Sequence, residues 1–370
     1  MRRRVRLAWL IVATCLCRAS FGAPPALETD DFKAEFALGS LVSLQQRGGH
    51  EMVRPPAQPR GVGIHCVKGT HWAGATEGPK TGAAADRATL ALSKFAGLEA
   101  ATAESVLQVD RATRELTLRQ QAHSQSKGVW GVSWTVAEIP REYAILVPGN
   151  SGLRLTDDSP GARHEFDYPI SWEAQLVIVE GRGRGFYVWA EDPKGRYKRL
   201  IVERRSSGWR LEFITINYAP FDELTSCESV LWRIGTYEGD WRVPARKYRR
   251  WSQSHFHPTP VEKQRPAWVK DIRGCAIMGQ DRKILEALPR RFDPKQTLLY
   301  LPSWRSSGYD RDYPEYDKPL PELEPFVRRA HELGFRVMLH VNYFGVDPLN
   351  PLYKEFEPYQ VRDPFGQHEK

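Results

Sequence analysis

The hydrophobic period of this chain changes once, near residue 240, and no single fold class accommodates both patterns. Before that point, four apolar runs separated by short turn sequences follow one another between Leu176 and Ala219. Their spacing predicts an antiparallel meander. Beyond Trp268, strand-like apolar runs alternate with helical patterns, which is the order of a parallel α/β sheet. The sequence therefore predicts a β domain followed by a separate α/β domain.

The β domain is expected to span residues 23–251. Residues 29–44 alternate apolar and polar side chains on either side of a Gly-Ser pair, which predicts a β-hairpin. Residues 241–251 place their aromatic and alanine side chains on one helical face, so we expect a helix to close the domain. Residues 74–103 are rich in Gly, Ala and Thr without a steady period, and we interpret them as a long mobile insertion.

The second half of the chain begins after an interdomain linker. Residues 252–268 include three prolines and lack a helical or strand period, which is typical of a linker. In residues 269–370 we expect a strand, a short helix, a second strand, a strong helix over Pro321–Leu333 and a third strand. This order is that of the opening of an α/β domain.

The first 22 residues have the pattern of an export signal. A basic segment precedes an apolar run from Leu7 to Cys17, whose eleven residues are fewer than the ~20 that a membrane-spanning helix needs. Ser20 and Gly22 are the small residues expected before a cleavage site. We therefore expect residues 1–22 to be a signal peptide cleaved after Gly22, an extracytoplasmic protein and no stable membrane span.

The net charge of +8 does not indicate a nucleic-acid partner. Five arginines and no acid lie in residues 1–22, so the remaining chain carries 48 basic against 45 acidic residues. The glycine-rich run at Gly181–Gly185 does not complete a phosphate-binding loop, because Phe186 stands where the third glycine is required. No metal-ligand spacing stands out either. We expect no nucleic-acid partner, no metal and no cofactor.

Polar and aromatic residues gather where two strands of the α/β domain end. The second strand runs to Trp304 and into a loop with four acids and three tyrosines, which includes Asp310 and Tyr313. The third strand ends at His340 and Asn342. Ligands bind at the carboxyl ends of parallel strands, and this composition suits a sugar, whose hydroxyls bond to carboxylates and whose C–H face stacks on aromatic rings. Composition alone leaves open a solvated acidic turn with packed tyrosines.

Three stretches carry a resemblance to a known group of proteins. They are ETDDFKAEFALGSLVSL at the start of the β domain, GDWRVPARKYRRW at its end, and LPSWRSSGYDRDYPEY followed by RRAHELGFRVMLHVNYFG in the α/β domain. Together they resemble an uncharacterised glycosidase-like family of secreted bacterial proteins. That family is related to the superfamily of α-galactosidases and endo-α-N-acetylgalactosaminidases.

The resemblance implies a galactose-mutarotase-like β-sandwich followed by the first part of a (β/α)₈ barrel. It places Trp304, Asp310, Tyr313 and Asn342 at the sugar site, with a carbohydrate as partner. It implies an exported glycoside hydrolase of the α-glycosidase type, and a non-catalytic carbohydrate-binding or scaffold protein is the alternative.

The catalytic residues are not among these positions. Glycosidases of this type use two carboxylates, and the resemblance implies that they lie on later strands, beyond Lys370. Only 102 residues follow Trp268, whereas a barrel takes ~200 to 250. We therefore expect a C-terminally incomplete chain without turnover of its own, in which Leu298, Leu301, Val337 and Leu339 form an exposed inner face.

Overall fold

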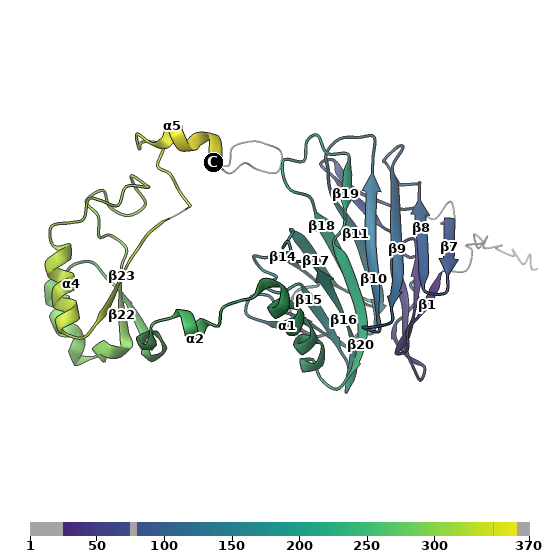
Figure 1. Cartoon of the computed structure of the whole chain (residues 1–370), viewed down its shortest axis with the longest axis horizontal. Helices are drawn as coiled ribbons and strands as arrows, with labels where there is room; N and C mark the ends of the chain where they lie inside the picture. The colour runs from purple at the N-terminus through teal and green to yellow at the C-terminus, as the bar shows by residue number, and fades with distance from the viewer. Residues whose placement is uncertain (1–24, 75–79, 343, 361–370) are drawn as a thin grey trace, which may run out of the picture. The chain divides into compact units, whose positions relative to one another are not determined.

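The computed structural model describes residues 25–74, 80–342 and 344–360 (Figure 1). The chain forms two compact units that divide between Phe256 and His257, within the segment predicted as a linker. We call the described residues up to Phe256 unit 1 and those from His257 unit 2. The predicted signal peptide, residues 1–22, lies outside the described residues.

Unit 1 consists of two ten-stranded sheets. The first contains β1 (Ala26–Glu28), β2 (Phe32–Ala37), β3 (Ser40–Gln46), β4 (His50–Val53), β5 (Gly63–Cys66), β6 (Gly69–Trp72), β11 (Val129–Ile139), β14 (Arg163–Tyr168), β17 (Lys198–Arg205) and β18 (Gly208–Ile216). The second contains β7 (Lys80–Ala84), β8 (Arg87–Leu92), β9 (Thr102–Asp110), β10 (Glu115–His123), β12 (Ala144–Val147), β13 (Leu153–Leu155), β15 (Leu176–Glu180), β16 (Arg184–Glu191), β19 (Ser226–Glu228) and β20 (Leu231–Glu238).

Buried aromatic side chains from both sheets form one core between them. Trp134 of β11 stacks on Phe213 of β18 with ring centroids 4.8 Å apart, and both contact Trp232 of the second sheet. Trp172, from the segment before β15, stacks on Trp232 at 6.4 Å. The two sheets therefore pack face to face, and the period of two in the sequence reflects one side of each strand entering this core.

The four runs between Leu176 and Ala219 form two hairpins in different sheets, so the prediction of a continuous meander is wrong. Strands β15 and β16 pair in the second sheet, while β17 and β18 pair in the first. The chain crosses over at Asp192, a buried carboxylate that accepts the backbone N–H groups of Lys194 and Arg196. It also accepts a bond from Lys198 Nζ at 2.7 Å. Periodicity identified the strands but not their partners.

The prediction of an insertion over residues 74–103 is also wrong where the structure describes it. Residues 80–84 and 87–92 form the hairpin β7–β8, and β8 pairs with β9. Ala88, Leu90 and Leu92 alternate with more exposed residues and point into the core. The period of two is present, but small alanine and threonine side chains make it faint. The predicted hairpin over 29–44 is confirmed as β2 and β3.

Helix α1 (Arg242–Phe256) ends five residues beyond the predicted boundary at 251. Its inward residues Tyr248 and Trp251 pack on Trp189 of β16, with ring centroids 5.9 and 5.0 Å apart. Two short helices, α2 (Val261–Gln264) and the 3-10 helix η1 (Ala267–Asp271), lie in the segment predicted as an irregular linker.

Unit 2 confirms the predicted alternation of strands and helices. Its three strands are parallel and adjacent in chain order. The elements are β21 (Gly274–Ile277), α3 (Arg282–Ala287), η2 (Leu288–Arg290), η3 (Pro294–Gln296), β22 (Thr297–Leu301), α4 (Leu323–Glu332), β23 (Arg336–Leu339), α5 (Tyr353–Phe356) and η4 (Glu357–Tyr359).

Helices α3 and α4 cover one face of the sheet of unit 2. Leu301, Val337 and Leu339 belong to the apolar cluster that includes residues of α3 and α4, so their predicted place on an open inner face is wrong. The opposite face carries Ile277, which is 71% exposed, and Met338, which is 44% exposed. Side chains alternate between the faces of a strand, which places Leu298 on this open side, opposite Leu301.

Candidate functional site

The carboxyl ends of the three strands of unit 2 meet at one edge of the sheet. The strands are parallel and in register, and the pairing continues past them. Met278 N–H bonds to the Tyr300 carbonyl, and His340 N–H bonds to the Leu301 carbonyl, each at 3.1 Å. We call the described segments that follow the three strands, residues 278–281, 302–322, 340–342 and 344–350, the rim. The rim contains every site residue predicted from the sequence.

Trp304 joins two segments of the rim from below. Its side chain is only 6% exposed, and its indole N–H donates to the carbonyl of His340 at 2.7 Å. Its ring stacks on Tyr316 at a centroid distance of 6.2 Å, and the Tyr316 hydroxyl donates to the carbonyl of Asn342. Trp304 therefore fixes the loop after β22 against the end of β23.

The loop after β22 curls around a buried guanidinium. Arg305 is 4% exposed and donates to the carbonyls of Glu315, Gly308 and Arg311 at 2.6, 3.2 and 2.9 Å. Its guanidinium carbon lies 4.4 Å from the ring centroid of Tyr313. No carboxylate of the described residues forms an ion pair with Arg305, so backbone carbonyls satisfy a charge that would otherwise be costly to bury. Sequence reasoning missed this residue, because one arginine among acids gives no signal of burial.

Asp310 and Tyr313 lie together on this loop. The buried Tyr313 phenol donates to Asp310 Oδ1 at 3.2 Å, and burial raises the pKa of Tyr313, which keeps the phenol protonated. Asp310 itself is exposed. It has a positive φ of 53°, a conformation that aspartate tolerates better than most residues. The exposed carboxylate is thus held in a fixed position and retains acceptor sites for a ligand.

Asn342 shapes the loop after β23. Its Oδ1 accepts the backbone N–H groups of Phe344 and Gly345 at 2.8 and 3.0 Å. This is a side-chain-to-backbone turn of the kind that asparagine often forms. The structure brings Asn342 next to Tyr316 and thereby close to Trp304. Tyr313, which bonds to Asp310, lies 5.8 Å from Tyr316 between ring centroids and joins these residues in one group.

His340 has the most unusual surroundings on the rim. Its Nδ1 is hydrogen-bonded to the Tyr300 hydroxyl, and the ring of Tyr309 lies 5.0 Å away. Its Nε2 is buried and has no hydrogen-bond partner among the described residues. The side-chain nitrogen of Gln280, after β21, is also buried without a hydrogen-bond partner among the described residues. From the sequence, His340 was expected only as a strand end, and no signal in the sequence singled out Tyr309 or Gln280.

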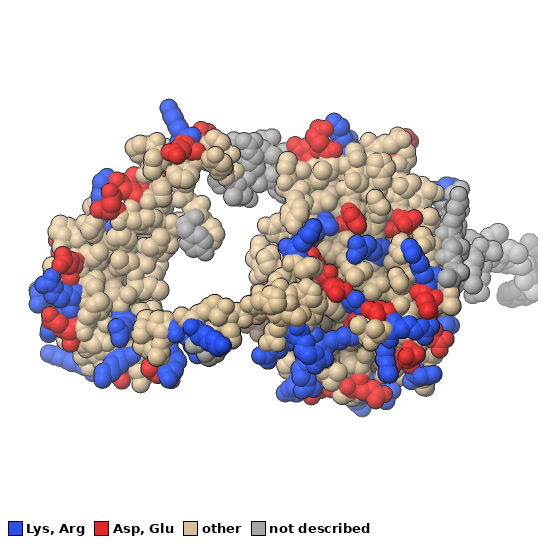
Figure 2. Space-filling model, viewed as in Figure 1, with Lys and Arg blue, Asp and Glu red and all other residues tan. Residues whose placement is uncertain are grey.

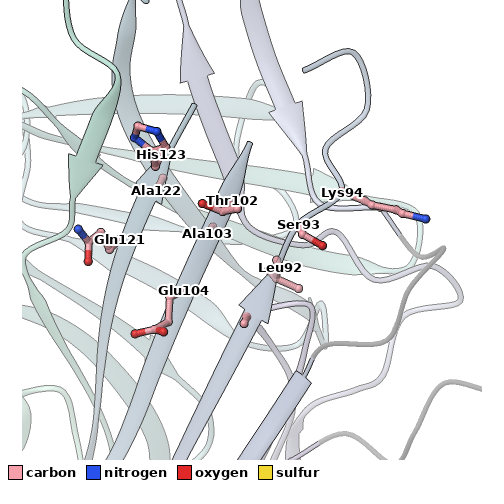
Figure 3. A pocket seen from close by; sticks show the side chains of 11 residues that line it. Leu92, Ser93, Lys94, Thr102, Ala103, Glu104, Gln121, Ala122 and His123 are labelled. Atoms are coloured by element: carbon pink, nitrogen blue, oxygen red, sulfur yellow. The ribbon is translucent and has the colours of Figure 1, made fainter. Parts of the chain in front are cut away.

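A separate hollow lies in unit 1, over the solvent-exposed face of β8, β9 and β10 (Figure 3). It measures about 530 Å³ and is lined by polar side chains that include Thr102, Glu104, Gln121 and His123. It has no aromatic residue in its lining and a single carboxylate. Its chemistry is that of a polar sheet surface, without the combination of carboxylates and rings found on the rim.

Two further absences apply to the described residues only. No group of three or more His, Cys, Asp or Glu among them is arranged to hold a metal ion. Within residues 25–74, 80–342 and 344–360, no helix is long and apolar enough to cross a membrane.

The fold defines a β-rich protein in which a parallel α/β unit follows two large sheets. Residues 229–369 match the family model described as a domain of unknown function (DUF6259). No curated protein matches the sequence.

Solved structures of the α-N-acetylgalactosaminidase NagBb from Bifidobacterium bifidum have a similar fold. The complexes with GalNAc and with Gal-NHAc-DNJ each superpose with a TM-score of 0.69 at 11% identity, over 93% of this chain and 62% of that one. The ligand-free structure gives a TM-score of 0.66 at the same identity and covers 93% and 63%. This chain therefore spans less than two thirds of NagBb. The likeness is one of fold, and it confirms at that level the resemblance to glycosidase-like proteins.

Proposed function

We propose that this protein is a glycoside hydrolase-like protein of the α-glycosidase type whose rim in unit 2 binds a sugar. The observation that carries the proposal is the arrangement at the end of β23. The exposed ring of Tyr309, the residue before the exposed Asp310, lies 5.0 Å from the ring of His340, whose Nε2 is buried without a hydrogen-bond partner among the described residues. A carboxylate that accepts hydroxyls, an aromatic ring and an unsatisfied imidazole nitrogen are the groups with which proteins recognise a sugar ring.

Each rim residue has a distinct role in this proposal. Asp310 accepts hydrogen bonds from sugar hydroxyls, and Tyr309, which is 50% exposed, offers a ring face for stacking. Trp304 and Tyr313 support these groups from beneath, since both are buried. Asn342 uses its oxygen to hold its own loop and contributes its amide nitrogen to the site.

The proposal extends to the details of the fold. We infer that unit 1 is a sandwich of the galactose-mutarotase type and that unit 2 is the opening part of a (β/α)₈ barrel. In such a barrel the helices cover the outside, and the second face of each strand lines a packed interior. The helices on one face of β21–β23, with Ile277 and Met338 on the other, support this assignment. Hydrolysis by the whole protein is part of the proposal, and its catalytic carboxylates are unassigned.

We also propose an extracytoplasmic location, which is supported by the basic and apolar pattern of residues 1–22. N-terminal sequencing of the exported protein tests it, and the expected first residue is Ala23. A chain that retains Met1 in the membrane fraction would contradict the cleavage.

A panel of sugars tests the proposed function. Saturation-transfer NMR with galactose, N-acetylgalactosamine and glucose at millimolar concentration should show transfer to at least one of them. The same samples are then offered aryl α-glycosides. Transfer to at least one sugar supports the site, and no transfer to any of the three sugars contradicts it. Release of the aryl group would contradict the expectation that these 370 residues have no turnover of their own.

A further inference from the structure

The outward face of α1 carries a row of arginines. Arg242, Arg246, Arg249 and Arg250 are exposed, and their spacing of four, three and one residues places them on one side of the helix. We call these four residues the arginine face. Figure 2 shows blue side chains gathered over the part of unit 1 where α1 lies.

The opposite side of α1 is fully engaged with the sheet, which fixes the direction of the arginine face. Tyr248 and Trp251 pack on Trp189. Lys247 turns inward and pairs with the buried carboxylate of Glu115, with 2.8 Å between Nζ and Oε1. Because the apolar residues and the inward lysine hold the helix in one orientation, the four arginines are held toward solvent.

Most of this positive charge has no ion-pair partner among the described residues, although Arg246 is near enough to Asp240 to help lower the pKa of that carboxylate. Arg242 pairs with Asp240 at 2.9 Å, but no carboxylate among the described residues lies within ion-pair distance of Arg246, Arg249 or Arg250. Elsewhere on unit 1, exposed cations are commonly paired. Examples are Arg111 with Asp86 at 2.5 Å and Arg163 with Glu165 at 2.8 Å.

The arrangement is unfavourable for the helix itself. Arg242 with Arg246, and Arg246 with Arg250, are like charges four residues apart, which repel each other on a helix surface. The Asp240 carboxylate, just before the helix, accepts the Arg242 N–H at 2.8 Å and complements the positive end of the helix dipole, so the cost of this face comes from repulsion between the arginines. Repulsion between these arginines lowers the stability of the helix, and their side chains add nothing to its packing. A binding partner therefore explains this face better than folding does.

Two neighbouring features enlarge this surface. The turn between β15 and β16 presents Arg182, and the Gly183 carbonyl accepts the N–H of Gly239 at 2.9 Å, which ties that turn to the segment before α1. Trp241 is 41% exposed, and the guanidinium of Arg242 lies 5.0 Å from its ring centroid. The surface thus combines several guanidinium groups with one accessible aromatic ring.

We propose that the arginine face, with Arg182 and Trp241, binds an anionic polysaccharide through its sulfate or carboxylate groups. Guanidinium groups bind such oxyanions through paired hydrogen bonds, and an indole ring stacks on the C–H face of a sugar. An anionic membrane fits less well, because a membrane-bound helix inserts its apolar face and that of α1 is buried on the sheet. A single exposed tryptophan is also less than the series of stacking rings that single-stranded nucleic acid binds. The proposal does not depend on the rim.

The test compares polysaccharides that differ only in charge. Affinity electrophoresis of the full chain with dextran sulfate should show binding that uncharged dextran does not give. The affinity should fall about tenfold or more from low to physiological salt, since exposed charges are screened. Polygalacturonate, run in parallel, shows whether carboxylates serve as well as sulfates.

Two double variants of equal net charge test whether dextran sulfate binds at the arginine face. Arg246→Gln with Arg250→Gln should weaken dextran sulfate binding by about tenfold or more, while Arg111→Gln with Arg163→Gln should change it less than about twofold. Circular dichroism should show both variants folded. Equal losses in the two variants would overturn the proposal, as would tighter binding to a DNA duplex or to phosphatidylserine vesicles than to dextran sulfate.

Discussion

In unit 1 a strand such as β18 is covered on both faces, whereas in unit 2 a strand such as β22 is covered on one. Phe213 of β18 packs in the aromatic core, and its neighbour Glu212 is buried on the opposite face against Ser133 at 3.1 Å. In β22, Leu299 and Leu301 lie under the helices, and Tyr300 between them faces the open side. Unit 1 encloses its core, which favours stability. Unit 2 keeps a sheet edge with polar loops exposed, which leaves these groups available for function.

The largest expected effect is in the enclosed core. Trp232→Ala removes a side chain that contacts Trp134, Trp172 and Phe213, and it should lower the free energy of unfolding of unit 1 by about 3–5 kcal/mol. Urea unfolding followed by circular dichroism measures this. A loss below about 1 kcal/mol would show that this core is not closely packed and would weaken the contrast between the units.

The buried histidine His65 predicts that the stability of unit 1 depends on pH. Burial lowers the pKa of His65 to about 3, whereas an unfolded histidine titrates near 6.5. Between these values only the unfolded state binds the proton, so stability is full above about 6.5 and is lost as pH falls toward 3. Burial raises the pKa of Glu212, 3.6 Å from His65, and this shift acts in the opposite direction.

The His65→Gln variant isolates the contribution of this histidine. Unfolding free energies of wild type and variant are measured at pH 7 and pH 5. The drop from pH 7 to pH 5 should be about 1–2 kcal/mol smaller in the variant. Identical drops would mean that His65 is not buried in the neutral form.

A smaller effect is expected where the rim is joined to the sheet of unit 2. Trp304→Phe keeps the buried ring but removes the indole N–H that donates to the His340 carbonyl. The free energy of unfolding of unit 2 should fall by about 1 kcal/mol. If urea unfolding of the two proteins coincides, Trp304 does not link the two loops.

The smallest effect is expected on the open face of unit 2. Ile277→Lys places a charge at a position that is 71% exposed, and it should change the free energy of unfolding by less than about 0.5 kcal/mol. Leu299→Lys on the covered face is the matched comparison and should unfold unit 2. Equal destabilisation by both substitutions would refute the one-sided packing of this sheet.

Local patterns predicted the hairpin β2–β3, strands β15–β18 and helix α1 of unit 1, together with the strand and helix order of unit 2, but not β7 and β8. The strand and helix order after Trp268 follows from periodicity, because strands and helices bury side chains at different intervals. The separation of β16 from β17 depends on the buried Asp192 and Lys198 pair, which no periodicity reveals. Trp304, Asp310, Tyr313 and Asn342 lie on the rim, and their part in sugar binding stays a prediction. The burial of Arg305 and the unpartnered Nε2 of His340 depend on how the loop closes.

The most direct test of the proposed sugar site is a titration with whichever sugar of the panel shows transfer. Isothermal calorimetry compares wild type with Asp310→Asn on the rim and with Glu324→Gln, an equal charge change at an exposed residue of α4. We expect Asp310→Asn to weaken binding about tenfold, corresponding to one charged hydrogen bond, and Glu324→Gln to leave it unchanged. Unaltered affinity in Asp310→Asn with the fold intact, or an equal loss in both variants, would contradict the proposed sugar site.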